Sequence, residues 1–350
     1  MIKYLGSKRT LVPVLGHLAV AAEAKSALDL FTGTTRVARA FKQQGLQVAA
    51  VDTASYSEVF GKTWLEIDSN DFDHEGLEDA IARLNAIEGQ AGYFTEKFCV
   101  EARFFQPSNG EKVDSIREAI EADYKGTELY YPLLASLILA ADKVDSTTGV
   151  QMAFLKNWTR RSNSAMQLKD PELIAGQGSF IRGDALEVIG ELDEVDLAYL
   201  DPPYNQHRYF GNYHVWESLV RWDKPDTYGI ANKRIDTRDS VNKSDFNSRK
   251  TMPAALAKVL RDTKAKTLML SFNNESWITA QDLVQIASER GHVRILDIDF
   301  KRYVGAKIGV FNKAGNRVGE PGESRNVEHI LICGEKKIVE QMHEAGLKFK

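Results

Sequence analysis

The stretch "SALDLFTGTTRVARAFKQQGLQVAAVD" at residues 26–52 decides the fold. Its first part, "SALDLF" (26–31), is a short apolar run typical of a buried strand. The next part, "TGTTRVARAFKQQG" (32–45), turns into a helix that Gly45 closes, and "LQVAAVD" (46–52) is a second strand. Strand, helix and strand in this order predict a β-α-β unit. The chain is therefore expected to have an α/β fold built on a parallel, doubly wound sheet.

The predicted sheet is interrupted and then resumed. Residues 61–175 carry mostly helical patterns, such as "SIREAIEADY" and "ELYYPLLASLILAADKV". We therefore expect a sheet domain formed by 1–60 and 176–350, with a mainly helical domain inserted at 61–175. Residues 205–252 are polar and aromatic without clear periodicity, and connections of this length are usually functional lids or disordered. Strand patterns return at 178–185, 195–200, 266–272, 293–300 and 327–335.

The composition is that of an ordinary soluble protein. Of the 350 residues, 43% are apolar and 27% are charged, and no apolar run approaches the roughly 20 residues of a membrane helix. The N-terminus lacks the apolar core of a signal peptide, so a cytoplasmic location without a membrane partner is expected. Cys99 and Cys333 are too few for a metal cluster or a disulfide framework and are expected to be buried. The net charge of -4 neither supports nor excludes DNA as a partner.

The turn after the first predicted strand suits a nucleotide-like ligand. Asp29 and Gly33 lie where this strand meets a helix N-terminus, and Asp52 ends the second strand. Glycine permits close approach of the backbone, and the second acid can accept hydrogen bonds from ribose hydroxyls. Thr35 stands where a pyrophosphate-binding loop has a second glycine, so no pyrophosphate cradle is expected. On these residues alone, a plain turn glycine and a strand-end acid explain the pattern equally well.

The stretch "VDLAYLDPPYNQHRYF" (195–210) ends an apolar strand on two prolines. Pro202 and Pro203 remove two backbone donors and fix two φ angles, so the chain leaves the sheet in one rigid direction. Asp201 and the carbonyl of Pro202 could then accept both N–H bonds of an exocyclic nucleobase amine and aim its lone pair at an electrophile. Tyr204 could stack on the same base. A rigid strand exit with a solvated aspartate is the alternative, and the four residues together favour the catalytic reading.

Four features in this order resemble the Dam-like, alpha-group DNA adenine-N6 methyltransferases. They are "KYLGSK" (3–8), "DLFTGTT" (29–35), the strand-end Asp52 and "DPPY" (201–204). The resemblance implies a Rossmann-like catalytic domain that uses S-adenosylmethionine, with residues 61–175 as an inserted target recognition domain. It also implies methylation of the N6 amine of a flipped adenine in double-stranded DNA. Such an enzyme would be a bacterial, cytoplasmic modification enzyme with a companion restriction endonuclease, and a monomer or weak dimer that meets the nucleoid during action.

The resemblance assigns residues to two sites and predicts no metal. The catalytic motif would be Asp201, Pro202, Pro203 and Tyr204. Asp184 could touch the adenine ring of the cofactor, although a helix cap before "ALEVI" is an equally good account. Transfer would be direct and in line, with no covalent enzyme intermediate. A cytosine-C5 enzyme would instead need an activated cysteine, and neither Cys99 nor Cys333 is placed as one. The family pattern assigns Tyr4, Lys8, Asp52 and Asp201 to the cofactor site, and we also expect Asp29, Phe31, Gly33 and Asp184 there.

Two polar runs are candidates for DNA contact. "KNWTRRSNSAMQLKD" (156–170) offers Lys156, Arg160 and Arg161 for phosphates, and interleaved acids weaken the field of 231–250. For either run alone, a solvated surface is the simpler account. A group of three rings beyond the motif could enter the vacated base stack or pack a lid: His207, Tyr209 and Tyr213.

Two other functional classes stay open on the residues alone. The same tetrapeptide chemistry serves N-methylation of RNA or of protein side chains. A non-catalytic DNA-binding module is the second alternative, and its mark would be a broken tetrapeptide, which this chain does not have.

Overall fold

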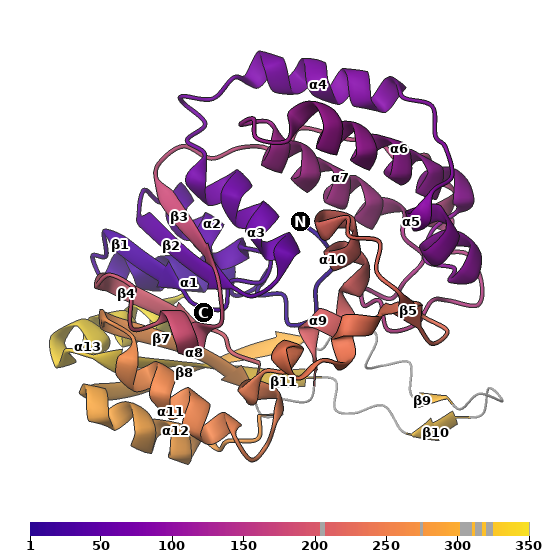
Figure 1. Ribbon diagram of the computed structural model, residues 1–350. Coiled ribbons are helices and arrows are strands. Elements are labelled where there is room, and N and C mark those ends of the chain that lie inside the picture. The colour runs from indigo at the N-terminus through magenta and orange to yellow at the C-terminus, as the bar shows by residue number, and fades with distance from the viewer. Residues whose placement is uncertain (204–206, 274–275, 302–309, 312–316, 320–324, 350) are drawn as a thin grey trace. The chain divides into compact units, whose positions relative to one another are not determined.

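The computed structural model of the chain describes residues 1–203, 207–273, 276–301, 310–311, 317–319 and 325–349 (Figure 1). The chain divides into two compact units. Unit 1 comprises Met1–Gly16, Lys25–Val188 and His207–Ser244, and unit 2 comprises His17–Ala24, Ile189–Gln206 and Asp245–Lys350. The first helix, α1 (Val12–Ala21), contributes residues to both units.

The main sheet has seven strands in the order β3-β2-β1-β4-β7-β11-β8. In unit 1, β2 pairs in parallel with β1 and with β3. In unit 2, β4 pairs in parallel with β7, and β11 runs antiparallel to both β7 and β8. This mostly parallel sheet confirms the predicted α/β class. The strands are β1 (Ser26–Asp29), β2 (Gln47–Asp52), β3 (Gly178–Arg182), β4 (Val195–Leu200), β7 (Ala265–Asn273), β8 (His292–Lys301) and β11 (Arg325–Gly334).

Unit 1 carries most of the helices. Between β2 and β3 the described residues form helices and no strand. In Figure 1, α4, α6 and α7 lie next to one another, and residues of each contact the other two. The helices of unit 1 are α2 (Arg36–Gln43), α3 (Ser55–Gly61), α4 (His74–Ala86), α5 (Tyr93–Thr95), α6 (Pro107–Tyr124), α7 (Tyr130–Val144), α8 (Ala185–Val188), α9 (Tyr209–Asn212) and α10 (His214–Arg221).

The described residues of unit 2 form three α-helices besides its part of α1. They are α11 (Met252–Asp262), α12 (Ala280–Ala287) and α13 (Lys336–Lys348). The α12 helix begins with a capping box, in which Thr279 and Asp282 satisfy each other's backbone N–H groups. Strand β4 is buried along almost its whole length, as expected of a strand inside a parallel sheet, which explains its unbroken apolar sequence. Two short pairs complete the strands, β9 (Val310–Phe311) with β10 (Arg317–Gly319) in this unit and β5 (Thr227–Tyr228) with β6 (Lys233–Arg234) in unit 1.

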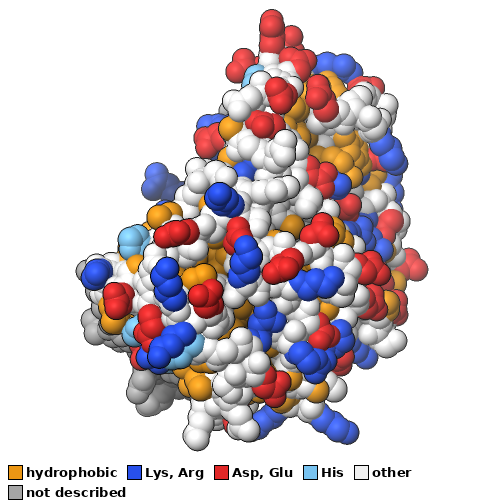
Figure 2. Space-filling model, turned by 90° about the vertical axis from the view of Figure 1, so that its left-hand side faces the viewer, with side chains coloured by type: hydrophobic (Ala, Val, Ile, Leu, Met, Phe, Trp, Pro, Cys, Tyr) orange, Lys and Arg blue, Asp and Glu red, His pale blue; other side chains and the backbone are white. Residues whose placement is uncertain are grey.

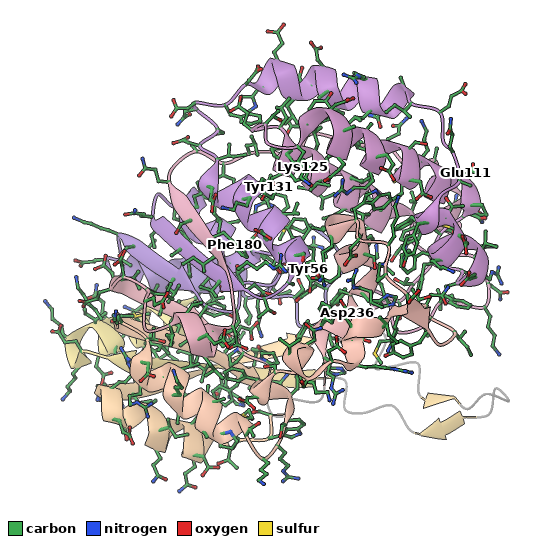
Figure 3. All side chains as sticks on the ribbon, in the orientation of Figure 1. Tyr56, Glu111, Lys125, Tyr131, Phe180 and Asp236 are labelled. Carbon is green, nitrogen blue, oxygen red and sulfur yellow. The ribbon has the colours of Figure 1, made fainter. Side chains whose placement is uncertain are left out.

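The core of unit 1 is rich in aromatic side chains. Phe60 and Trp64 stack with ring centroids 5.0 Å apart, and both are fully buried. A side chain at Gly61 would clash with the ring of Phe180 of β3, so glycine is needed there. Figure 3 labels Phe180. The buried Lys42 donates to the carbonyl oxygens at the end of the π-helical turn Lys62–Glu66, a favourable place for a cation. Burial lowers the pKa of Lys42 to about 8.

The connection after the predicted catalytic motif contains regular structure, although its sequence shows no clear periodicity. The described part contains α9, α10, β5, β6 and several short 3-10 turns. Val215, Leu219 and Val220 of α10 have the spacing of a buried helix face; the first two are buried and Val220 is half-buried. Arg234 is also buried, and its guanidinium binds the carboxylates of Asp223 and Asp236 at 2.7 and 2.8 Å. Ion pairs as well as apolar contacts therefore stabilise the structure of this segment. For this reason its sequence shows no clear hydrophobic periodicity.

Both cysteines are buried, as predicted. Burial raises the pKa of the Cys99 thiol, and it raises the pKa of Cys333 to about 11. Neither is therefore an activated thiolate. Within the described residues, no helix combines the length and apolar character needed to cross a bilayer.

A buried histidine should make stability depend on pH. His214 is fully buried, its Nε2 lies 2.8 Å from the Gln151 carbonyl oxygen, and burial lowers its pKa to about 3. The unfolded chain takes up this proton near pH 6.5, so stability present above pH 6.5 is lost as the pH falls toward 3. We expect a contribution of about 2 kcal/mol to be lost by pH 5.

Urea unfolding at pH 7.5 and pH 5 checks this expectation, with His214→Gln as the comparison because its amide can still donate to Gln151. The variant should lose less stability between the two pH values. An equal loss in both proteins would show that His214 is not the titrating group.

Candidate functional site

Asp29 stabilises the loop between β1 and α2, which is predicted to bind the cofactor. This residue ends β1 and is 1% exposed. Its Oδ2 accepts hydrogen bonds from the Thr32 hydroxyl at 2.8 Å and from the Ala38 N–H at 3.1 Å. Asp29 therefore fixes the turn between β1 and α2, which gives it a defined structural task in addition to its predicted cofactor role.

Asp52 reaches the same loop from the end of β2. Its Oδ2 accepts from the Gly33 N–H at 2.8 Å, and its Oδ1 accepts from the Ala54 N–H at 3.0 Å. Burial raises the pKa of the Asp52 carboxyl, and these N–H donors oppose the rise. The Thr53 N–H also opposes the rise, so a ligand would share this carboxylate with donors of the protein itself.

Gly33 is required both for its backbone conformation and for space. Its φ of +52° lies in the left-handed region, and a Cβ there would stand 3.0 Å from the Tyr4 ring. Tyr4 in turn lies against Tyr56 of α3, with the two hydroxyl oxygens 3.2 Å apart. The structure therefore brings Tyr4, Gly33 and Asp52 together, and Tyr56, labelled in Figure 3, joins them although the sequence did not point to it.

The other predicted cofactor residues of unit 1 are placed as follows. Lys8 is 8% exposed and its carbonyl oxygen accepts the first hydrogen bonds of α1. Phe31 is half-buried in the turn after β1. Asp184 Oδ1 accepts from the Leu186 N–H at 2.8 Å, so its carboxylate caps α8. The cap that the sequence offered as an alternative is thus present, and contact with the cofactor stays a prediction for these residues.

The donor set of this loop fits S-adenosylmethionine in its chemistry. The cofactor carries a ribose, an ammonium group and a carboxylate, which call for acids and a base. Asp52 supplies a carboxylate beside Gly33, the Tyr4 ring lies against Gly33, and Lys8 supplies a positive charge in the same unit. The residues present therefore suit the group that the sequence predicts.

The first three residues of the predicted catalytic motif belong to unit 2. Asp201, Pro202 and Pro203 follow the carboxyl end of β4 without regular secondary structure, as the two prolines require. Pro202 is buried, while Asp201 and Pro203 are half-buried. Tyr204 lies outside the described residues.

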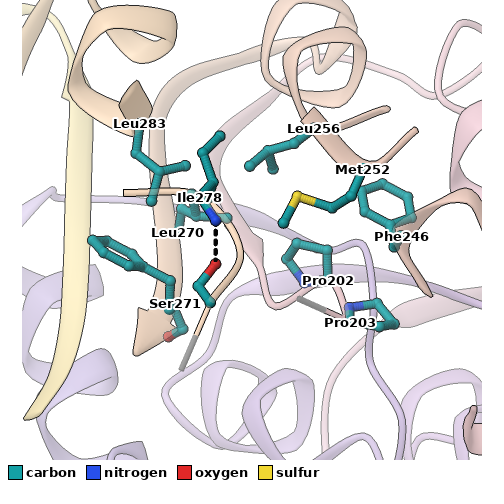
Figure 4. Close-up of a pocket in the computed structure, with 11 residues that line it drawn as sticks. Pro202, Pro203, Phe246, Met252, Leu256, Leu270, Ser271, Ile278 and Leu283 are labelled. Atoms are coloured by element: carbon teal, nitrogen blue, oxygen red, sulfur yellow. Dashed lines mark hydrogen bonds between the residues drawn. The ribbon is translucent and has the colours of Figure 1, made fainter. Parts of the chain in front are cut away.

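A mostly apolar pocket lies beside the two prolines (Figure 4). In the close-up, Met252 and Phe246 stand next to the proline rings. The rest of the lining comes from β7, α11, α12 and the residues before α12, namely Leu256, Leu270, Ser271, Phe272, Ser276, Ile278 and Leu283.

The residues proposed for DNA contact separate into two groups. Lys156 and Arg160 are exposed, and Arg103 stacks over Trp158 with its guanidinium 4.6 Å from the ring centre. Arg161 instead binds the buried Asp145 at 2.6 Å, which makes it a structural residue. On the face shown in Figure 2, Lys and Arg side chains are mixed with Asp and Glu, so that face carries no uniform positive field.

Glu217 is a second polar residue that the sequence analysis missed. It is 1% exposed on α10, and its Oε1 accepts from the Ser55 N–H, the first residue of α3, at 2.7 Å. Burial raises the pKa of this carboxyl. A glutamate on the buried side of an amphipathic helix was the only signal that could have found it.

Comparison with known proteins decides the family. The family model of the D12 class N6 adenine-specific DNA methyltransferases matches residues 4–286, well over half of the chain. The chain belongs to this family. The predicted resemblance to DNA adenine-N6 methyltransferases is thereby confirmed, and so is the Rossmann-like class of the sheet.

Curated relatives of this D12 class chain are modification enzymes. Modification methylase StsI of Streptococcus sanguinis is 31% identical over 324 residues, which cover 86% of this chain and 49% of that protein. Type II methyltransferase M.NlaIII of Neisseria lactamica is 29% identical over 304 residues, covering 83% of this chain and 88% of that protein. The chain thus spans about half the length of StsI and most of M.NlaIII.

The comparison with solved structures finds a weak similarity to the methyltransferase domain of bacterial CtHen1. It has a TM-score of 0.34 and 10% identity, and the alignment covers 93% of this chain and 98% of that one. A likeness of this size carries no argument about function.

Proposed function

We propose that the D12 class chain transfers the methyl group of S-adenosylmethionine to the N6 amine of an adenine flipped out of duplex DNA. In a bacterial cytoplasm it would act as the modification enzyme of a restriction-modification system, beside a companion endonuclease. The observation that carries the proposal is the intact Asp-Pro-Pro-Tyr motif that begins directly after β4, in a chain of this family. The relatives named as modification methylases support the restriction-modification context.

Unit 1 would hold the cofactor. When bound, S-adenosylmethionine supplies a methyl group made electrophilic by its sulfonium sulfur. Asp52 would accept hydrogen bonds from the ribose hydroxyls while it keeps the Gly33 N–H, and Lys8 would meet the carboxylate. The Tyr4 ring, which lies against Gly33, would form one wall of the cofactor pocket.

Unit 2 would prepare the target amine. The N6 lone pair of adenine is delocalised into the ring, which makes the amine a poor nucleophile. The Asp201 carboxylate and the Pro202 carbonyl would accept its two N–H bonds, so that the lone pair is directed out of the ring plane. As the nitrogen gains positive charge, the ionised Asp201 would stabilise the transition state more than the ground state.

DNA has to be held while the base is outside the stack, because flipping costs a few kcal/mol. We assign phosphate contacts to Lys156 and Arg160, whose side chains are exposed. Arg161 and Arg234 are excluded from this role because each is engaged with a carboxylate. The helical insertion at 61–175, which contains Lys156 and Arg160, would be the target recognition domain.

A comparison of two substitutions tests stacking by Tyr204. A stacked ring needs its face and not its hydroxyl, so Tyr204→Phe should keep most activity. Tyr204→Ala should lose the roughly 1 to 3 kcal/mol that stacking contributes per base. The methylation rate of a duplex oligonucleotide is measured for both variants. Equal losses of rate would show that the hydroxyl, and not the face of the ring, makes the contribution.

The proposed function as a whole is tested in a host that expresses the chain. Sequencing of methylated bases in its genome should find N6-methyladenine at one short recurring sequence. Methylation confined to RNA or protein in the same cells would favour the alternative N-methyltransferase, and no methylation of any of them would favour a non-catalytic module.

A further inference from the structure

The tyrosine cluster around Tyr4 lies within unit 1 and joins distant parts of its sequence. The Tyr4 ring stacks on Tyr213, with centroids 4.6 Å apart and planes at 18°. It also stacks on Tyr209, at 5.3 Å and 26°. The two partners come from the segment that follows the catalytic motif, whereas Tyr4 belongs to the N-terminal segment assigned to the cofactor.

Tyr213 contacts the N-terminal segment through its hydroxyl as well as through its ring. It is 1% exposed, and its hydroxyl oxygen accepts from the Leu5 N–H at 2.6 Å. The same hydroxyl donates to the Gly149 carbonyl oxygen at 3.2 Å. Ring and hydroxyl together therefore fix both the side chain of Tyr4 and the backbone of the residue after it.

Glu217 gives the same helix a second hold on the cofactor loops. It accepts the N–H of Ser55, which follows Asp52 by three residues at the start of α3. The Ala54 N–H beside it goes to Asp52. Residues of α10 and its N-cap thus touch the chain next to Tyr4 and next to Asp52.

The other end of α10 is anchored to the helical insertion. Arg117 of α6 is 1% exposed, and it donates to the carbonyl oxygens of Leu219 and Val220 at 2.9 and 3.0 Å. A guanidinium on the last carbonyls of a helix satisfies groups that would otherwise lack partners. The helix is therefore fixed at both ends, as a support for neighbouring segments must be.

We infer that α10 braces the cofactor site and that Tyr213 and Glu217 are positioning residues for it. Tyr213 sets Tyr4 against Gly33, and Glu217 sets the start of α3 beside Asp52. Neither side chain needs to touch S-adenosylmethionine. The inference rests on the proposed function, because it assumes that Tyr4 and Asp52 bind this cofactor.

The test measures S-adenosylmethionine binding by calorimetric titration of the full chain. Tyr213→Phe keeps the ring stack but leaves the Leu5 N–H without its acceptor, so affinity should fall about three- to tenfold. The matched control is Tyr93→Phe, which removes a hydroxyl bond of 2.6 Å to the Pro225 carbonyl in the same unit. This control should lose a similar amount of thermal stability and keep wild-type affinity.

Glu217 is tested by rescue. Glu217→Ala should raise the KM for S-adenosylmethionine with little change in kcat, and Glu217→Gln, which keeps an acceptor for Ser55, should restore it. Equal affinities for Tyr213→Phe and Tyr93→Phe would overturn the inference, as would identical KM values for the Ala and Gln variants. Wild-type protein that binds no S-adenosylmethionine would instead defeat the proposed function itself.

Discussion

Asp201→Asn is expected to lower turnover by about a hundredfold or more while duplex DNA binding survives. The substitution keeps the size and shape of the side chain but replaces a charged acceptor with an amide. Its cost should therefore fall on the transition state, where the N6 nitrogen gains positive charge, rather than on the ground state. Single-turnover methylation of a duplex at saturating S-adenosylmethionine isolates this step, since Asp201 is also predicted to contact the cofactor.

A matched control for this experiment lies on the same strand. Asp196 of β4 pairs with Lys266 at 2.7 Å on the exposed surface, away from the carboxyl end of the strand. Asp196→Asn removes a charge of the same kind and should methylate at close to the wild-type rate. If Asp201→Asn matched this control, the prolines would be a feature of the fold alone.

Asp52→Ala is expected to weaken S-adenosylmethionine binding by about 1.5 to 3 kcal/mol, or roughly 10- to 150-fold. The variant loses the charged acceptor for the ribose and also the bonds that hold the Gly33 and Ala54 N–H groups. Some loss of thermal stability should accompany the loss of affinity. Calorimetric titration measures the affinity, and a melting curve measures the stability.

The stability component can be separated with Asp73→Ala. Asp73 caps α4 of the same unit through the Gly76 N–H at 2.9 Å, and loss of a cap costs about 1 kcal/mol. This variant should melt earlier but bind S-adenosylmethionine as the wild type does. Unchanged affinity in Asp52→Ala would remove Asp52 from the cofactor site.

The sequence predicts β4 and β7 well because their burial makes them almost continuously apolar. The predicted strand at 195–200 coincides with β4, and the one at 266–272 lies within β7. The antiparallel direction of β11 leaves no such mark, since a buried strand has the same apolar composition in either direction. The order of the strands is likewise decided by long-range packing.

Side chains that act through tertiary contacts were harder to predict than those in local motifs. Gly33 and Asp52 stand at recognisable places in a β-α-β unit, and the structure joins them by a hydrogen bond. Glu217 is buried against Ser55 of another helix, and Arg234 is buried against Asp223 and Asp236; the sequence does not display either pairing. Tyr213 could be predicted only as an aromatic residue after the motif, with its packed position undecided.

The most direct test of the account is nucleoside analysis of DNA after incubation with the purified chain. Duplex DNA carrying many different sequences would be incubated with isotope-labelled S-adenosylmethionine, digested to nucleosides and examined by mass spectrometry, with Asp201→Asn in parallel. The account predicts labelled N6-methyladenine from the wild type and at most about a hundredth of that rate from the variant. Labelled methylcytosine in place of N6-methyladenine, or equal N6-methyladenine from both proteins, would contradict it.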